Sequence, residues 1–310
     1  MIRPSGPARL VLAAAATLVG VQVLLLLLFV MAPGTAADVI AHGAQRDALE
    51  VAWGYRDPLL LRLGQRLLDV VTFNLGTSRT LSPGAPVSDL LFNPLARTTT
   101  LVVAAVGLLV VSAVVSALRA TGRGAMHHVQ TLFTLPHFVA AHLCVNGLNQ
   151  VAWWAAERGL IDRPGWFPLP LEVSTLRFVI AVTVVAWASG AFGETRDVFS
   201  DAVQTIRVSP FVDAARARGQ SVRLIEWHHL VPVVADVVAR RIPIAFGAVV
   251  FVDPLLQLGG LGNLLWRATE ERDLDVAFAI VTMIATWVAA TRLASDLIAL
   301  AVDPRLRTAS

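Results

Sequence analysis

The stretch LVLAAAATLVGVQVLLLLLFVMA, residues 10–32, carries no charged side chain over its whole length. A helix needs about 20 mostly apolar residues to cross roughly 30 Å of hydrocarbon, so this run is long enough to span a membrane. A cleaved signal peptide is the alternative, because Arg3 and Arg9 precede the run and small residues follow it at 35–37. The apolar core of a signal peptide is shorter, about 7 to 15 residues. We therefore expect a membrane-spanning helix here.

The whole chain has the composition of a membrane protein. Of its 310 residues, 56% are hydrophobic and only 15% are charged, whereas about 25% are charged in a typical soluble protein. The mean hydropathy is +0.67. The formal net charge is only +3, and the Arg residues are scattered along the chain, which argues against a nucleic-acid partner.

The chain contains no lysine, since all 25 of its Lys and Arg residues are Arg. A GxxxxGK[ST] phosphate-binding loop and a Schiff-base lysine are therefore both excluded. If the protein takes part in energised work, the nucleotide must be bound and hydrolysed by another chain.

Five further apolar runs follow the first. They cover residues 98–118, 129–151, 176–193, 242–258 and 276–300. We predict an all-α polytopic membrane protein with about six transmembrane helices. Its domains are then 1–97, a transmembrane helix with a long extracytoplasmic segment, and 98–310, a core of five transmembrane helices with a cytoplasmic loop at 196–232.

Arginine placement predicts the orientation of these spans. Arg119, Arg123, Arg196, Arg216 and Arg218 all fall in segments on one side of the predicted membrane, and the short loops on the other side hold fewer Arg residues. Short cytoplasmic loops carry the excess of positive charge in membrane proteins. We therefore expect a multi-pass protein with both termini in the cytoplasm.

The cytoplasmic loop contains a predicted short helix. Ser209 is a suitable N-cap, Pro210 suits the first helical position, Asp213 falls in the first turn and Gly219 provides a stop. The helix is amphipathic and is expected to lie on the inner face of the membrane. We expect a contact ridge of Phe211, Ala214 and Ala215, flanked by Arg216 and Arg218.

This loop resembles the EAA loop of ABC importer permeases. Asp213-Ala214-Ala215 is followed by Gly219 after three residues and by Pro232 after twelve more. Other stretches, in the same order along the chain, are similar to motifs of the first-subunit type of dipeptide, oligopeptide and nickel permeases. They are Asn74–Ser78, Thr134–Phe138, Gly165–Pro168, Gly247–Asp253, Gly260–Gly262, Arg272-Asp273 and Asp303–Arg305.

The resemblance implies a permease subunit of an ATP-driven importer in the bacterial inner membrane. Such a subunit forms half of a translocation pathway for peptides or a similar small solute. Implied partners are a second homologous permease, cytoplasmic ATPase subunits, an extracytoplasmic solute-binding protein and the lipid bilayer. No cofactor is expected on this chain, because ATP and Mg²⁺ bind to the ATPases, and no enzymatic activity of its own is expected. The coupling residues implied are Phe211, Asp213, Ala214, Ala215, Arg216, Arg218, Gly219 and Pro232.

Polar residues near the predicted spans are candidates for the pathway or its gate. They are Pro136, His137, Asn146, Asp253, Gly260 and Gly262. Ionisable groups within a membrane are expensive to bury and are function candidates for that reason. The adjacent His pairs at 127–128 and 228–229 predict no metal site, because neighbouring side chains on a helix point in different directions and no Cys/His set completes them.

Two other functions fit the same residues. An intramembrane serine hydrolase could use Ser189 as nucleophile and His137 or His142 as base, although it would also need an oxyanion hole. A membrane scaffold without transport is the second alternative. Ser189→Ala discriminates the hydrolase from a transporter, and copurification with ATPase subunits discriminates the transporter from a scaffold.

Overall fold

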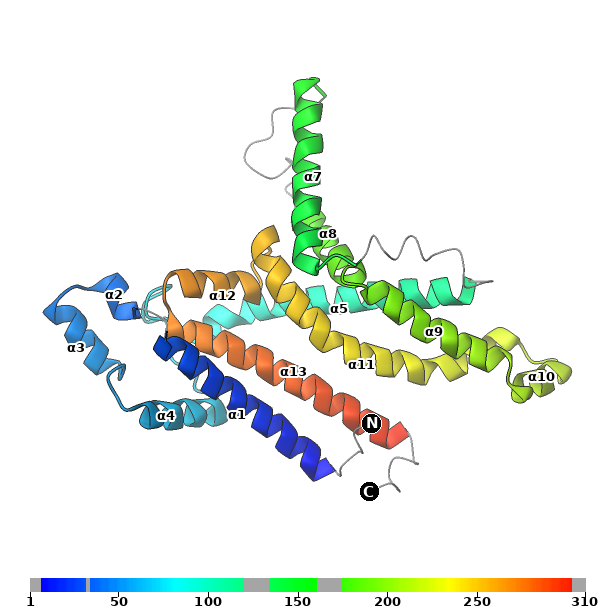
Figure 1. Ribbon diagram of the computed structural model, residues 1–310, viewed down its shortest axis with the longest axis horizontal. Coiled ribbons are helices and arrows are strands. Elements are labelled where there is room, and N and C mark those ends of the chain that lie inside the picture. The colour runs from blue at the N-terminus through cyan, green and yellow to red at the C-terminus, as the bar shows by residue number, and fades with distance from the viewer. Residues whose placement is uncertain (1–6, 32–33, 120–133, 161–173, 303–310) are drawn as a thin grey trace. The chain divides into compact units, whose positions relative to one another are not determined.

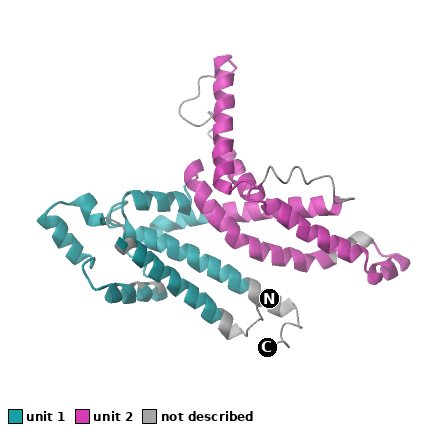
Figure 2. Ribbon diagram, in the orientation of Figure 1, with its two compact units in different colours: residues 1–97, 259–310 teal, residues 98–258 magenta. Residues whose placement is uncertain are grey.

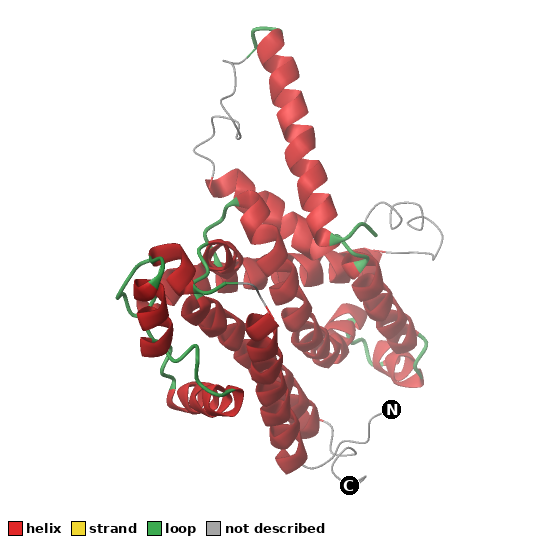
Figure 3. Cartoon of the chain, turned by 60° about the vertical axis from the view of Figure 1, so that its left-hand side comes forward, coloured by secondary structure: helices red, strands yellow, loops and turns green. Residues whose placement is uncertain are grey.

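A computed structural model of the chain describes residues 7–31, 34–119, 134–160 and 174–302, and this part is made of helices without a strand. Loops and turns join the helices (Figure 3). The all-α prediction is confirmed. The resembling stretches Gly165–Pro168 and Asp303–Arg305 lie outside the described residues.

The chain forms two compact units, and the first comprises residues 1–97 and 259–310 (Figure 2). In this unit α1 and α13 lie side by side (Figure 1), and the buried Gln22 Nε2 donates to Thr282 Oγ1 across 2.6 Å. Such hydrogen bonds hold apolar helices together where lipid removes the hydrophobic drive for packing. The helices of the unit are α1 (Pro7–Met31), α2 (Ala36–Ile40), α3 (Ala44–Ala52), α4 (Leu59–Thr72), α12 (Leu261–Glu270) and α13 (Leu274–Val302).

The second unit comprises residues 98–258 and is organised around α11. This long helix contacts α7, α8, α9 and α10, and it buries Leu230, Phe246 and Val249. Its helices are most of α5 (Val87–Arg119), α7 (His137–Glu157), α8 (Ser174–Trp187), α9 (Ala191–Arg207), α10 (Pro210–Ala217) and α11 (Val222–Leu256).

Several described helices are long and apolar enough to cross a membrane. Three qualify alone, namely α1, α5 and α13, and the number rises to five if the bent pairs α8–α9 and α11–α12 each count as one span. The expected third span, α7, is not among them because its His and Asn side chains lower its hydropathy. Its predicted beginning at 129–133 lies outside the described residues, so a sixth span remains a prediction.

Two predicted spans differ from the structure, one at a proline and one at a turn. Pro136 precedes α7 as its N-cap instead of lying within the span. The run at 176–193 breaks after Trp187, where Ser189 has a φ of 55°. The fifth run ends close to its predicted end, because α11 runs through Pro254 to Leu256. Proline is tolerated in membrane helices where neighbouring groups satisfy the freed carbonyl.

The fifth span also begins much earlier than predicted. Helix α11 starts at Val222 rather than near Ile242, so most of the predicted loop at 196–232 is helical. Pro232 and Pro243 lie inside α11. The loop is therefore a helical hairpin in which α10 joins the end of α9 to the beginning of α11.

Candidate functional site

Helix α10 is built by local signals that the sequence contains. Pro210 occupies the first turn, and Gly219 has a φ of +76° just past the last turn. The Gly219 N–H donates to the Arg216 carbonyl and the Gln220 N–H to the Ala215 carbonyl, each across 3.0 Å. This pair of bonds is a Schellman motif, which satisfies the last carbonyls of a helix and favours glycine at the left-handed position. The predicted beginning and end of the helix are confirmed.

The exposed face of α10 differs from the predicted ridge. Ala215 is only 3% exposed and Val212 is fully buried, so these two side chains fix α10 to its own chain. The ring of Phe211 is partly exposed and stacks on His229 with its centroid 4.8 Å away. Ala214, Ala217 and the charged Asp213, Arg216 and Arg218 are exposed as well. Ala215 therefore belongs to the inner face and not to the ridge.

An ion pair closes the base of this helical hairpin. Arg207, the last residue of α9, donates from Nε to Glu226 Oε1 of α11 across 2.6 Å. The Glu226 side chain is only 5% exposed. Arg207 also reaches the Leu118 carbonyl of α5, at 3.4 Å. Asp213 and Arg216 form a second ion pair, at 3.1 Å, on the exposed surface of α10.

The remaining predicted site residues lie in different places. Pro232 is exposed and lies within α11, ten residues after its start. Asp253 is buried in α11 of the second unit. Gly260 is the N-cap of α12 in the first unit, and Gly262 is buried there. Nothing in the described geometry assigns a pathway or gate to these three residues.

His137 lies at the start of α7, and its Nδ1 is 2.9 Å from Ser189 Oγ. The pair proposed for a hydrolase is thus in contact, but the Ser189 N–H already donates to the Leu135 carbonyl at 2.8 Å. That N–H is therefore not free to stabilise an oxyanion, and His137 has no carboxylate partner among the described residues. The contact ties the start of α7 to the break between α8 and α9. Pro136 and Asn146, which lie close to His137 in the sequence, are both exposed.

The structure also assembles a site that sequence reasoning missed. The Asp273 carboxylate accepts hydrogen bonds from Ser78 Oγ at 2.6 Å and from the N–H groups of Arg79, Thr80 and Leu81 at 2.9 to 3.1 Å. Burial alone would raise the pKa of Asp273, but these donors hold it below its ordinary value. The stretches Asn74–Ser78 and Arg272-Asp273 both resemble motifs of the same permease family. That shared resemblance was the signal in the sequence that could have indicated a common site.

The second unit presents a short amphipathic helix, α10, which is firmly attached between two long helices. A helical membrane protein built in this way has the architecture of a transporter's membrane subunit. Residues 104–308 match the family model described as "Binding-protein-dependent transport system inner membrane component". The match covers more than half of the chain. The chain belongs to this family, and it is a multi-pass inner-membrane permease subunit of an ABC importer of the peptide/oligopeptide group.

The names of individual relatives are consistent with membership of this family. The chain is 25% identical to the "Metal-staphylopine import system permease protein CntB" of Staphylococcus aureus, over 89% of this chain and 85% of the relative. It is 24% identical to a "Probable peptide ABC transporter permease protein" of Sinorhizobium fredii, over 93% of this chain and 94% of the relative. Neither the family nor these relatives give support to a hydrolase or a scaffold.

Proposed function

We propose that this chain pairs with a second homologous permease to enclose a translocation pathway, and that α10 is the helix through which ATPase subunits drive it. The chain itself performs no covalent chemistry. ATP and Mg²⁺ bind to the ATPase subunits, and a solute-binding protein delivers the cargo on the other side of the membrane. Both termini lie in the cytoplasm, in agreement with the Arg distribution.

The observation that carries this proposal is the way α10 is mounted. Its inner face, Val212 and Ala215, is buried, while Ala214, Arg216 and Arg218 remain exposed. The Arg207–Glu226 ion pair joins the two long helices on either side of it. A force applied to the exposed face is therefore transmitted to α9 and α11 together, as the rigid-body rocking of alternating access requires.

Cargo is proposed from the relatives. One is named for the import of a metal-staphylopine complex and the other for peptide transport. A short peptide, or a metal chelate of similar size and polarity, is the cargo class that both names suggest. We propose that six residues contribute to the pathway or its gate, namely Pro136, His137, Asn146, Asp253, Gly260 and Gly262. For His137 and Asn146 the reason is that a polar helix such as α7 is stable in a membrane only against protein or water.

The docking role is tested by placing a large charged side chain on the exposed face of α10. Ala214→Arg is expected to reduce binding-protein-stimulated ATP hydrolysis about tenfold or more, as the loss of one central interface contact does. Gln204→Arg is the matched control, because Gln204 is exposed on α9 outside α10. Wild-type stimulation in Ala214→Arg, with normal amounts of protein in the membrane, would overturn the proposal.

A further inference from the structure

Helix α4 has an apolar face that no other described element covers. Leu60 is 81% exposed, Leu61 51%, Leu68 63% and Val71 76%. At about 100° per residue these four side chains fall within one stripe of the helix. The chain around them is the segment between α1 and α5, which the sequence places outside the cytoplasm.

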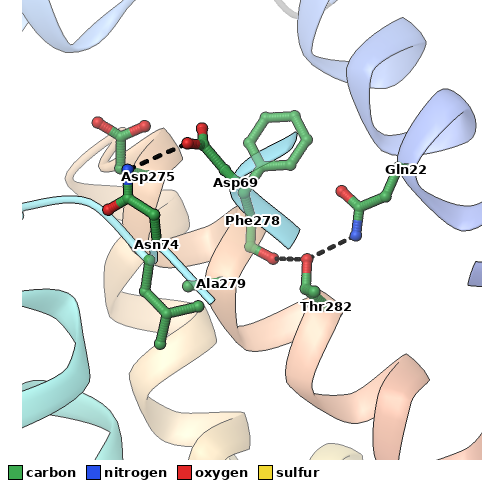
Figure 4. A pocket seen from close by; sticks show the side chains of 8 residues that line it. Gln22, Asp69, Asn74, Asp275, Phe278, Ala279 and Thr282 are labelled. Atoms are coloured by element: carbon green, nitrogen blue, oxygen red, sulfur yellow. Dashed lines mark hydrogen bonds between the residues drawn. The ribbon is translucent and has the colours of Figure 1, made fainter. Parts of the chain in front are cut away.

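The opposite face of α4 is polar and is turned toward the protein. Arg62, Gln65 and Asp69 recur at intervals of three and four residues and line a cavity of about 240 Å³. Asp69 accepts a hydrogen bond from Asn74 Nδ2 at 3.1 Å. Figure 4 shows this contact in the smaller adjoining pocket, where Gln22 and Thr282 also meet. Arg62 and Asp69 therefore form hydrogen bonds inside the first unit, Gln65 borders the cavity and is exposed, and the apolar face is directed away from the cavity.

The depth of α4 is fixed by its neighbour α1. The two helices are in contact, and Leu26 of α1 lines the same cavity as Arg62 and Asp69. Leu26 lies within the apolar span Val11–Leu28, five residues before the helix ends at Met31, which corresponds to about 7 Å along the axis. Helix α4 is therefore at the level of the last turns of a membrane-spanning helix, where Leu24, Leu27 and Leu28 are exposed as well.

We infer that α4 is an interfacial membrane helix whose exposed leucines and valine are inserted into the acyl chains of the outer leaflet. Lipid is the occupant that the depth requires, because water at this level is replaced by hydrocarbon and headgroups. A helix with one apolar and one charged face typically lies in the interface with its apolar side about 5 to 10 Å below the headgroup boundary. The segment between α1 and α5 is then anchored to the bilayer at its middle and does not extend freely from it.

Spin labels on α4 test this position directly. Cys144 is the chain's single cysteine, so Leu60→Cys, Leu68→Cys and Gln65→Cys are made in a Cys144→Ser background. The assembled importer is reconstituted in vesicles of phosphatidylethanolamine and phosphatidylglycerol. The accessibility of each label to dissolved oxygen, which concentrates in lipid, is compared with its accessibility to a water-soluble nickel complex. Val51→Cys on α3 is the matched control, because Val51 is 61% exposed outside the apolar stripe.

Labels at 60 and 68 are expected to be accessible to oxygen and protected from nickel, while labels at 51 and 65 are accessible to nickel. Nickel access at 60 and 68 would overturn the inference, because the stripe would then face water. Protection from both reagents would also overturn it, because another protein surface would then cover the stripe. The experiment measures position and not transport, so its outcome is independent of the role proposed for α10.

Discussion

Arg207 and Glu226 lie 19 residues apart in the chain, and the Arg207 Nε donates to Glu226 Oε1 across 2.6 Å. The bond joins the last residue of α9 to the first turns of α11, with α10 between them. Glu226 is almost completely buried, whereas Arg207 is partly exposed. The pair therefore closes the base of the helical hairpin that carries α10, and it determines how far α10 can move independently of the long helices.

Removing one partner of this pair should destabilise the hairpin. Arg207→Ala leaves the buried Glu226 carboxylate without its donor, and such a loss costs about 1–3 kcal/mol. We expect a lower midpoint of thermal unfolding in detergent and a weaker stimulation of ATP hydrolysis by the binding protein. Glu226→Gln should have a smaller effect, because the amide oxygen still accepts from Arg207.

A double variant tests whether the side chains of Arg207 and Glu226 stabilise the hairpin by interacting directly with each other. Arg207→Ala combined with Glu226→Leu removes both charges, and losing both partners is less costly than stranding one buried charge. We expect the double variant to be more stable than Arg207→Ala alone. Strictly additive losses would contradict a direct interaction between the two side chains.

Gly219 should be required for its backbone conformation and not for space. Its φ is +76°, and a Cβ added there would meet no atom within 4 Å. Gly219→Ala is expected to cost about 1–2 kcal/mol, because a left-handed conformation is strained for residues with a side chain. Gly219→Asn should cost less, since Asn adopts this conformation more readily.

Gly147→Ala is the matched control for Gly219. Gly147 lies inside α7 and also has open space around its Cβ position, but its conformation is helical. Alanine in a helix is favoured over glycine by about 0.5–1 kcal/mol. Thermal unfolding should therefore shift in opposite directions for the two variants, and equal shifts would argue against a conformational role for Gly219.

Asp273 should make the packing of residues 78–81 dependent on pH. Its folded pKa lies below the ordinary value, so its carboxylate contributes stability above the unfolded pKa, and this contribution is lost as pH falls through the folded pKa. We expect the protection of the Arg79, Thr80 and Leu81 amides from hydrogen exchange, measured relative to the intrinsic exchange rate at each pH, to fall in acid. In Asp273→Asn this protection should already be low at neutral pH and should change little on acidification. A wild-type profile in Asp273→Asn would contradict the role of the carboxylate.

Much of the fold could be predicted because it follows from local rules. The apolar run at 10–32 predicted α1, and Pro210 with Gly219 predicted the bounds of α10, since end signals act within one turn. Prolines were a source of error. Pro136 lies inside the predicted run at 129–151 but precedes α7 as its N-cap, whereas Pro254 lies inside α11 without interrupting it. Tolerance of a proline depends on neighbours that a local reading does not include.

The contacts of the site were less predictable than its elements. Ala215 was expected on the outer ridge, but it packs against its own chain with Val212. Which face of a short helix turns inward depends on the helix that it packs against, here α11. The predicted start of that helix, near residue 242, is about twenty residues after its actual start at Val222. Ser78 and Asp273 are 195 residues apart, and no local pattern indicates a contact over that separation.

The most direct test of the central claim is the neighbour of Ala214 in the assembled importer. In a Cys144→Ser background, Ala214→Cys carries a short photoactivatable cross-linker on the exposed face of α10, and Gln65→Cys on α4 carries the same reagent as a control. We expect Ala214→Cys to cross-link to an ATPase subunit and Gln65→Cys not to do so. An intact complex in which position 214 cross-links only to lipid or to the binding protein would contradict the account.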